Sequence, residues 1–286
     1  MPEASFSPMK STNPNEITRL LGSELYTLNP SLVVLGDPTT SLFSRWTLKV
    51  KKMFFSAVAI SFMGLLTPVA MLLPNLHTRF VAKVIPAMME DLAHGLRHER
   101  STLLKNVQGK VLDVGAGGGA YFKHYSSATS VVAIEPMTQL HPHLKSKGLE
   151  LGINDRLILT TSFIETFLQE HPDEAGTFDW VILGNVLCEV PDIASALQTC
   201  DKLLRPGSGT LYFCEHIAQP PGSIMRTIQM VINPWWVRIS KGCNCNRESF
   251  KYIKAMRGWE SISWTYNMVG GHPWVGPFVI GLARKK

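Results

Sequence analysis

VLDVGAGGGAY, at residues 111–121, is the stretch that decides the fold of this chain. It is an apolar run that leads into a glycine-rich turn, and a second apolar run, AIEP at residues 133–136, ends in an acid about twenty residues further on. An α/β fold holds a nucleoside in this way, because glycines let the ligand approach the backbone and the carboxylate of Glu135 accepts hydrogen bonds from ribose hydroxyls. The same turn also satisfies the dinucleotide pattern G-x-G-x-x-[GA], so this stretch alone leaves nicotinamide-dependent enzymes open.

The composition is that of an apolar, moderately basic chain of 286 residues, with 45% hydrophobic and 17% charged residues. This length fits one catalytic domain with an extension. The net charge is +6, but Lys and Arg are scattered, without the long basic run or recognition motif of a nucleic-acid-binding protein, so no nucleic-acid partner is expected. An anionic membrane surface suits this charge better. The five cysteines are an odd number, which suits a reducing compartment and free thiols.

An uncharged apolar segment lies ahead of the glycine-rich turn. It is MFFSAVAISFMGLLTPVAMLL, at residues 53–73. Its length and the basic residues ahead of it meet the criteria for a membrane helix. Gly64 and Pro68 interrupt it, and Arg79 and Lys83 make its other flank basic too. We therefore expect a kinked, monotopic insertion from the cytosolic face of a membrane. A buried helix that caps the active site is the alternative interpretation.

The chain divides into three parts. Residues 1–45 are expected to form a loose N-terminal arm, residues 46–106 the apolar membrane-anchor or cap helices, and residues 107–286 the catalytic domain. In the third part apolar runs alternate with helical patterns, which predicts a parallel sheet with helices on both faces. Runs at 262–268 and 275–283 predict an antiparallel pair that closes the sheet. The expected parallel strands are 110–114, 130–134, 157–161, 178–184 and 209–215, and the clearest helix is 191–205.

Two further stretches distinguish between the cofactors, FDWVILGNVLCEV at residues 178–190 and LLRPGSGTL at residues 203–211. A dinucleotide needs phosphate contacts at a helix N-terminus, whereas S-adenosyl-L-methionine (SAM) has no phosphate and needs the glycines only for close approach. The order and spacing of these stretches resemble those of the class I methyltransferases. The resemblance implies an α/β, Rossmann-like, seven-stranded sheet that binds SAM and transfers a methyl group. A dehydrogenase is the minor alternative.

The chain also resembles a narrower family, the methyltransferase-like seven proteins, which are membrane-associated thiol S-methyltransferases. The residues that carry this resemblance are CEHI at 214–217, QPPGS at 219–223, PWW at 234–236, GC at 242–243, RE at 247–248 and VGP at 275–277. It covers roughly residues 77–286 and implies methyl transfer to a small alkyl thiol, on the cytosolic face of the endoplasmic reticulum or a lipid droplet. Phe278 stands where family members usually show a histidine, and GAGGG at 115–119 stands where they commonly show GCGTG.

The class I resemblance places the cofactor at the carboxyl ends of the first four strands. Glu135 is expected to bind the ribose hydroxyls, and the backbone carbonyl of Asn185 the methionine ammonium group. Asp113 is expected to order the glycine-rich turn, and the adenine to lie beside the residues that follow the third strand. The expected cofactor-binding residues are Asp113, Gly115, Gly117, Glu135, Ser162, Phe163 and Asn185.

The acceptor is expected near the carboxyl end of the fifth strand, where open α/β sheets place their sites. His216, with Glu215 beside it, is the candidate general base or nucleophile-orienting group. A thiol needs little help from a base, whereas an alcohol usually needs one. The interval 217–258 is expected to form a lid over an apolar substrate. Glu189, near the same rim of the sheet, is suited to bind a cationic or hydroxylated group of the substrate. The expected substrate-binding residues are Glu189, Met225, Trp235 and Trp236.

No metal ion is expected, because Cys243-Asn244-Cys245 offers two cysteines without a second ligand pair. The sequence therefore predicts methyl transfer from SAM to a small apolar molecule, at a thiol or alternatively at an oxygen or nitrogen. Two other functions stay open: a SAM-binding enzyme that steers a rearrangement in a natural-product pathway without methyl transfer, and a membrane-surface scaffold with a vestigial pocket. The oligomeric state stays open too.

Overall fold

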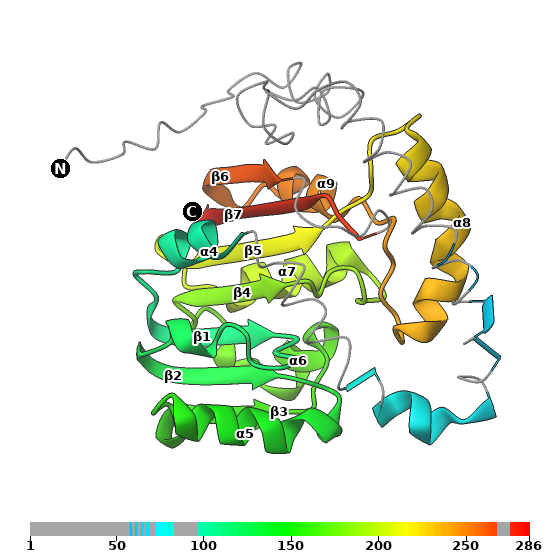
Figure 1. Ribbon diagram of the computed structural model, residues 1–286. Helices are drawn as coiled ribbons and strands as arrows, with labels where there is room; N and C mark the ends of the chain where they lie inside the picture. The colour runs from blue at the N-terminus through cyan, green and yellow to red at the C-terminus, as the bar shows by residue number, and fades with distance from the viewer. Residues whose placement is uncertain are drawn as a thin grey trace.

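The computed structural model describes residues 96–267 and 275–286, together with scattered positions between 58 and 82. Over these residues the chain forms one seven-stranded sheet with helices packed against it (Figure 1). The predicted arm at 1–45 lies outside the described residues, and so does most of the predicted anchor at 46–106. Among the described residues, no helix combines the length and the apolar character that a membrane span requires.

The sheet confirms the predicted alternation of strands and helices. Its strand order is β3-β2-β1-β4-β5-β7-β6, with β1 to β5 parallel and the last two strands antiparallel to their neighbours. The predicted terminal pair is therefore confirmed, and β7 joins it to β5. The strands are β1 (Gln108–Val114), β2 (Ser127–Ile134), β3 (Leu157–Thr160), β4 (Trp180–Gly184), β5 (Thr210–His216), β6 (Trp259–Asn267) and β7 (Phe278–Lys285).

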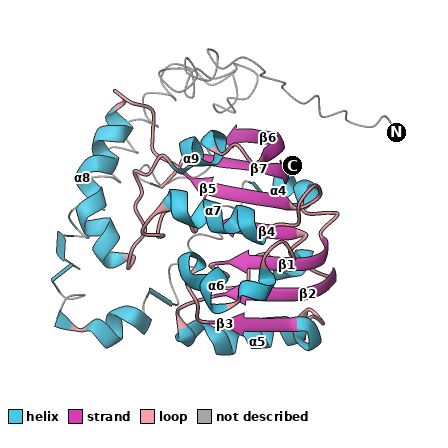
Figure 2. Cartoon of the chain, turned by 180° about the vertical axis from the view of Figure 1, so that it is seen from behind, coloured by secondary structure: helices cyan, strands magenta, loops and turns pink. Residues whose placement is uncertain are grey.

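Each face of the sheet carries its own apolar cluster, because successive strand residues point to opposite faces. In β1, Val111 belongs to one cluster, whereas Leu112 and Val114 belong to the other. The first cluster includes side chains of α5 (His141–Glu150) and α8 (Ile224–Ile239). The second includes side chains of α6 (Ile164–Glu170), α7 (Ile193–Leu203) and α9 (Ser249–Ala255), and these three helices lie in front of the sheet in Figure 2. The described residues also form α4 (Arg97–Leu103) and the 3-10 helices η3 (Phe122–His124), η4 (Thr138–Leu140), η5 (Asn154–Arg156) and η6 (Pro172–Glu174), and positions 74–79 are helical as well.

The helix predicted at 191–205 is confirmed as α7. It begins after Asp192, whose side chain accepts a hydrogen bond from the backbone N–H of Ala194 at 2.9 Å. Such a cap satisfies a donor that the first helical turn leaves without a backbone partner. Pro206 follows the end of the helix, where a proline cannot continue the hydrogen-bonding pattern.

The interval 217–258, predicted as a lid, forms α8 and α9. α9 packs against α7 on one face of the sheet, so it does not cover the strand ends. α8 stands beyond the carboxyl ends of the parallel strands (Figure 1). The strand order reverses between β1 and β4, which is where open α/β sheets bind their ligands.

Candidate active site

A cavity of about 1100 Å³ opens at the carboxyl ends of β1, β2 and β4. Its volume is at the upper end of the range of small-molecule sites. The turns after these three strands form one wall, and described positions from 78 to 82 and from 240 to 241 form the other. The predicted site residues that line it are Gly115, Gly117, Glu135, Phe163, Asn185 and Glu189.

The glycine-rich turn after β1 is held against the end of β2. The backbone N–H groups of Gly115 and Ala116 both donate to the carbonyl of Ile134, at 2.9 and 3.0 Å. Gly115 has φ +68°, and a Cβ there would meet Cγ2 of Val186 at 2.8 Å, so this position requires glycine. At Gly117, with φ +55°, a Cβ would meet nothing closer than 3.8 Å. The space beside the Cα of Gly117 is therefore open to a ligand in the cavity.

Glu135 directly follows β2 and lines the cavity. One carboxylate oxygen accepts a hydrogen bond from the N–H of Gly117 and the other from the N–H of Met137, both at 2.8 Å. Burial raises the pKa of this carboxyl, and the two N–H donors oppose that rise. Each oxygen keeps further accepting capacity, which the hydroxyl groups of a ribose can use. The carboxylate is thus oriented by the same turn that would hold the rest of the nucleoside.

Asp113 and Ser162, predicted to bind the cofactor, do not line the cavity. Asp113 is buried, and the hydroxyl of Tyr125 donates to its Oδ2 at 2.9 Å, so the pair joins β1 to the segment that follows the glycine-rich turn. Burial raises the pKa of Asp113 to about 7. The Ser162 hydroxyl donates to Glu170 at 2.5 Å and faces α6 instead of the cavity. Phe163, next in the chain, is 58% exposed and does line the cavity, so its predicted contact with an adenine ring stays a prediction.

Asn185 follows β4 with φ +57°, a conformation that favours glycine. β5 holds it there, because its backbone N–H donates to the Cys214 carbonyl at 2.9 Å and its side-chain Oδ1 accepts from the N–H of His216 at 3.2 Å. Glu189, four residues on, lines the cavity, and its side chain is exposed. Desolvation by the surrounding atoms of the cavity wall, together with the nearby acidic groups of Cys243 and Glu135, raises the pKa of the Glu189 carboxyl to about 8. The turn after β4 thus presents an amide and a carboxyl to a ligand.

The cavity fits SAM better than a dinucleotide. The open backbone at Gly117, the carboxylate of Glu135 and the exposed ring of Phe163 supply the contacts that an adenosyl group needs. A dinucleotide would place its pyrophosphate at the N-terminus of a helix that follows the glycine-rich turn. Here the turn leads into η3, a single 3-10 turn.

Glu215 and His216, the predicted catalytic residues, are fully buried and do not line the cavity. Glu215 accepts hydrogen bonds from the N–H groups of Val186 and Leu187, at 3.1 and 3.3 Å, and burial raises its pKa to about 7. His216 directs Nε2 toward Sγ of Cys243 at 3.3 Å. The predicted contact with an acceptor is therefore absent from this arrangement, because the loop after α8 covers the end of β5. Both residues instead support the turn after β4.

The predicted substrate contacts on α8 are also displaced from the cavity. Trp236 is buried and its indole N–H donates to Sγ of Cys243 at 3.2 Å, whereas Trp235 is 37% exposed on the outer side of the helix. Met225 is half-buried near the start of the helix. Among the described residues, α8 reaches the cavity only through Ser240 and Lys241, which follow its last turn. The lid stays a prediction: the end of this helix lines the cavity, and Trp235 and Trp236 do not.

A cluster of sulfur and imidazole groups lies behind the turn after β4, and sequence reasoning missed it. Cys188, His216 and Cys243 are all buried, and their Sγ and Nε2 or Nδ1 atoms lie within 4.8 Å of one another. Hydrogen bonds from Cys188, His216 and Trp236 hold the pKa of the Cys243 thiol well below its ordinary value, although burial opposes this. These residues come from three separate segments, so no local motif announces the cluster.

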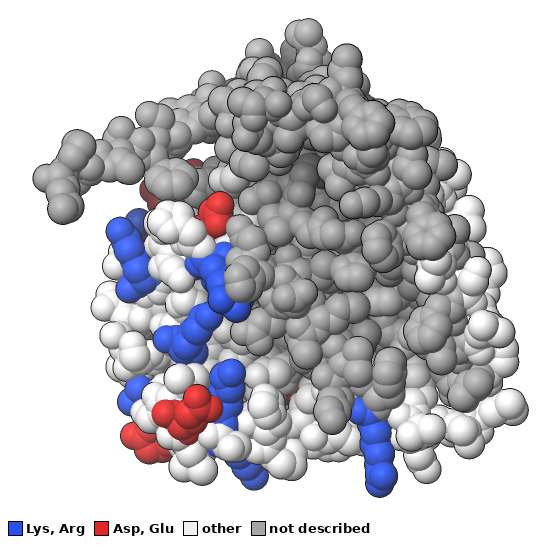
Figure 3. All heavy atoms as spheres, viewed as in Figure 1, with Lys and Arg blue, Asp and Glu red and all other residues white. Residues whose placement is uncertain are grey.

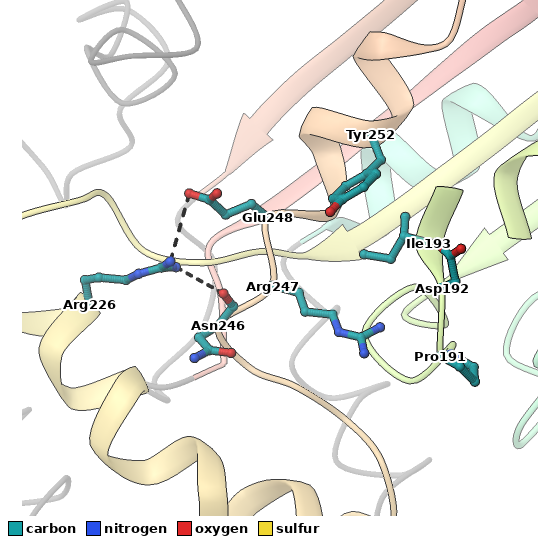
Figure 4. Close-up of a pocket in the computed structure, with 8 residues that line it drawn as sticks. All are labelled: Pro191, Asp192, Ile193, Arg226, Asn246, Arg247, Glu248 and Tyr252. Carbon is teal, nitrogen blue, oxygen red and sulfur yellow. Dashed lines mark hydrogen bonds and ion pairs between the residues drawn. The ribbon is translucent and has the colours of Figure 1, made fainter. Parts of the chain in front are cut away.

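Arg247 anchors the same turn from the other side. Its guanidinium donates to the carbonyl of Leu187 at 3.0 Å and also to that of Val190. It lines a smaller pocket, shown in Figure 4, where Arg226 bridges Glu248 and the backbone of Asn246. The arginines of this pocket are thus engaged in holding the segments around the turn that carries Glu189.

Comparison with known proteins agrees with this geometry. The model of the methyltransferase domain matches residues 88–262. Thiol S-methyltransferase TMT1B of Rattus norvegicus is 31% identical over 177 residues, which cover 61% of this chain and 70% of that protein. Thiol S-methyltransferase TMT1A of Homo sapiens is 32% identical over 144 residues, 50% of this chain and 57% of that protein.

The fold has counterparts among solved structures. Geranyl diphosphate methyltransferase in complex with SAM shows a TM-score of 0.50 and 16% identity, covering 70% of this chain and 90% of that one. The cyclase SpnF shows a TM-score of 0.51 and 16% identity, covering 68% of this chain and 80% of that one. The methyltransferase domain model covers more than half of the sequence. The chain therefore belongs to the methyltransferase family, as a class I enzyme that depends on S-adenosyl-L-methionine and resembles the thiol S-methyltransferases.

Proposed function

We propose that this protein methylates the sulfur of a small apolar thiol at a membrane surface. The observation that favours a thiol as the acceptor is the position of His216. Its imidazole is buried against Cys243 and lies away from the cavity. A thiol has a pKa near 8.5 and ionises with little assistance, whereas an alcohol usually needs a positioned base. The similarity to thiol S-methyltransferases points to the same acceptor.

Three features of this chain would hold the cofactor. Glu135 would bind the ribose hydroxyls, the backbone at Gly117 would lie against the ligand, and Phe163 would cover the adenine ring. When bound, SAM supplies a methyl group that its sulfonium sulfur already activates for displacement by a thiolate. The walls of the cavity supply the rest, because they exclude water and restrict the approach of the acceptor.

The acceptor side of the cavity lies between the turn after β4 and the loop after α8. Asn185 and Glu189 line one side of it, and Ser240 and Lys241 line the other. The Glu189 carboxyl would contact a polar group of the acceptor, as the sequence predicts. Apolar contact would come from Val186 and Val190, which line the same wall.

Exposed apolar side chains near the cavity support the proposed contact between this protein and a membrane surface. Leu72, Leu73 and Leu76 are exposed on the described part of the segment before α4, and positions 78, 79, 81 and 82 of that segment reach the cavity wall. The His77 ring lies 2.6 Å from the Ile239 carbonyl, which places this segment beside the end of α8. Figure 3 shows Lys and Arg side chains on the part of that face that grey atoms leave visible, with Asp and Glu side chains near some of them.

The test is an acceptor panel for the full chain in detergent micelles. Methyl-labelled SAM is supplied with alkanethiols and with alcohols, phenols and amines of equal size, and products are identified by mass. We expect methyl thioethers from the thiols and little product from the others. Methylation of a phenol or amine alone would reassign the acceptor. Tight SAM binding with no methylated product would favour the non-methylating rearrangement, and weak SAM binding with retained membrane association would favour the scaffold.

A further inference from the structure

The cluster behind the turn after β4 joins three parts of the fold. Cys188 lies in that turn, His216 is the last residue of β5, and Cys243 lies in the loop after α8. We propose that these three side chains bind one zinc ion, which fastens the loop after α8 to the rim of the sheet. The inference is independent of the acceptor that the enzyme methylates.

The distances suit three of the four coordination positions of a tetrahedral ion. Zinc binds thiolate sulfur at about 2.3 Å and imidazole nitrogen at about 2.0 Å, so neighbouring ligand atoms lie roughly 3.5–3.8 Å apart. Here Nε2 of His216 lies 3.3 Å from Sγ of Cys243, and all three ligand atoms lie within 4.8 Å of one another. Small side-chain movements are enough to accommodate the ion.

The chemistry of the donors selects the metal. Two thiolates and an imidazole suit zinc and other soft transition-metal ions, whereas magnesium and calcium require oxygen ligands. Binding releases the remaining thiol protons to solvent, and the two thiolate charges then neutralise the divalent ion. A neutral cluster avoids the cost of an unpaired buried charge.

Hydrogen bonds around the cluster hold its two cysteines in place, as the surroundings of metal sites commonly do for their ligands. The indole N–H of Trp236 donates to Sγ of Cys243, which stabilises a thiolate there. Asn244 fixes the position of Cys188, because its backbone N–H and side-chain amide donate to the Cys188 carbonyl, at 3.0 and 3.2 Å. Phe278 packs edge-on against the His216 ring, with 6.2 Å between ring centres.

The ion would act on the active site through both loops that it joins. The loop with Cys243 also carries Ser240 and Lys241, and the turn with Cys188 also carries Asn185 and Glu189, all of which line the cavity. Fastening these segments fixes the width of the acceptor side. Cys245, two residues beyond Cys243, is not part of the cluster, since its sulfur contacts Gln229 and Asn233.

The test measures metal content and does not depend on activity. The full chain is purified without chelator, and zinc is counted by elemental mass spectrometry. We expect about one zinc per chain in the wild type and at least a tenfold lower content in Cys188→Ser and Cys243→Ser. The matched controls Cys245→Ser and Cys200→Ser, also buried cysteines, keep the wild-type content. Circular dichroism shows whether each variant is folded.

A second measurement uses only the wild type, so its result does not depend on whether the variants fold. The metal-free wild type is titrated with cobalt(II), and thiolate coordination gives intense charge-transfer and tetrahedral visible bands. The proposal is overturned if the wild type takes up neither metal, or if Cys188→Ser and Cys243→Ser keep full occupancy. A peptide pair joined through Cys188 and Cys243, two hydrogens lighter than the separate peptides, would also overturn it, because it would show a disulfide in place of the ion.

Discussion

At the scale of single residues, Gly115 combines a left-handed φ with a close neighbour at the cavity wall. Gly115→Ala would place a Cβ 2.8 Å from Val186 and keep a left-handed φ, so we expect it to lose stability and SAM affinity together. Gly152→Ala is the matched control, because φ is +66° there and a Cβ would meet nothing within 4 Å. Both should lose about 1–2 kcal/mol from backbone strain, and only Gly115→Ala should weaken SAM binding. Thermal unfolding and calorimetry measure the two effects, and equal SAM affinity in the two variants would contradict the account.

Asp113 makes stability depend on pH. Burial raises the pKa of its carboxyl from 3.8 to about 7, so the folded chain binds this proton more tightly than the unfolded chain. The free energy of unfolding should therefore fall as pH rises from about 4 to about 7 and then level off. Between pH 5 and pH 8 the contribution of this group is about 2–3 kcal/mol.

The comparison is urea unfolding of the wild type and Asp113→Asn without cofactor at both pH values. Asn keeps an oxygen that accepts the hydrogen bond from Tyr125 but cannot ionise. We expect the wild type to lose about 2–3 kcal/mol more than the variant over this range. The same pH dependence in both proteins would show that another group is responsible.

At the scale of elements, the strands were predictable because each is an apolar run between turn residues. β6 followed from alternation of apolar and polar residues, β7 from a continuous apolar run, and α7 from its apolar face and its stop at Pro206. α8 shows where periodicity fails. Its pattern distinguishes a buried side from an outer side, but it does not say that Trp236 points at Cys243 instead of the cavity.

The outer side of α8 predicts how the protein meets a membrane. Ile224, Val231 and Trp235 are exposed along it. Replacing all three by Ser should lower binding to lipid vesicles by roughly tenfold or more, since each apolar side chain that enters lipid contributes of order 1 kcal/mol or more. Cosedimentation measures the bound fraction. Leu149→Ser, an exposed leucine on α5, is the control and should bind as the wild type does. An unchanged bound fraction in the triple variant would remove α8 from the membrane surface.

At the scale of the whole molecule, the site lies at the switch point of the sheet, and its cofactor side was predictable. Glu135 and the glycine-rich turn meet because β1 and β2 are parallel neighbours, a consequence of topology that the pattern encodes. The acceptor side depends on contacts between distant segments, such as His216 with Cys243, 27 residues apart. Burial of His216 follows from how the loop after α8 folds back over β5, and no local sequence pattern contains that information.

The central claim is that the cavity at the ends of β1, β2 and β4 holds SAM through Glu135. Calorimetric titration of the wild type, Glu135→Ala and the exposed-surface control Glu150→Ala with SAM tests it most directly. The account predicts that Glu135→Ala weakens binding by about 1–3 kcal/mol, roughly 5- to 150-fold, through loss of charge-assisted hydrogen bonds. Glu150→Ala should bind as the wild type does. Equal affinity in Glu135→Ala and the wild type would contradict the account.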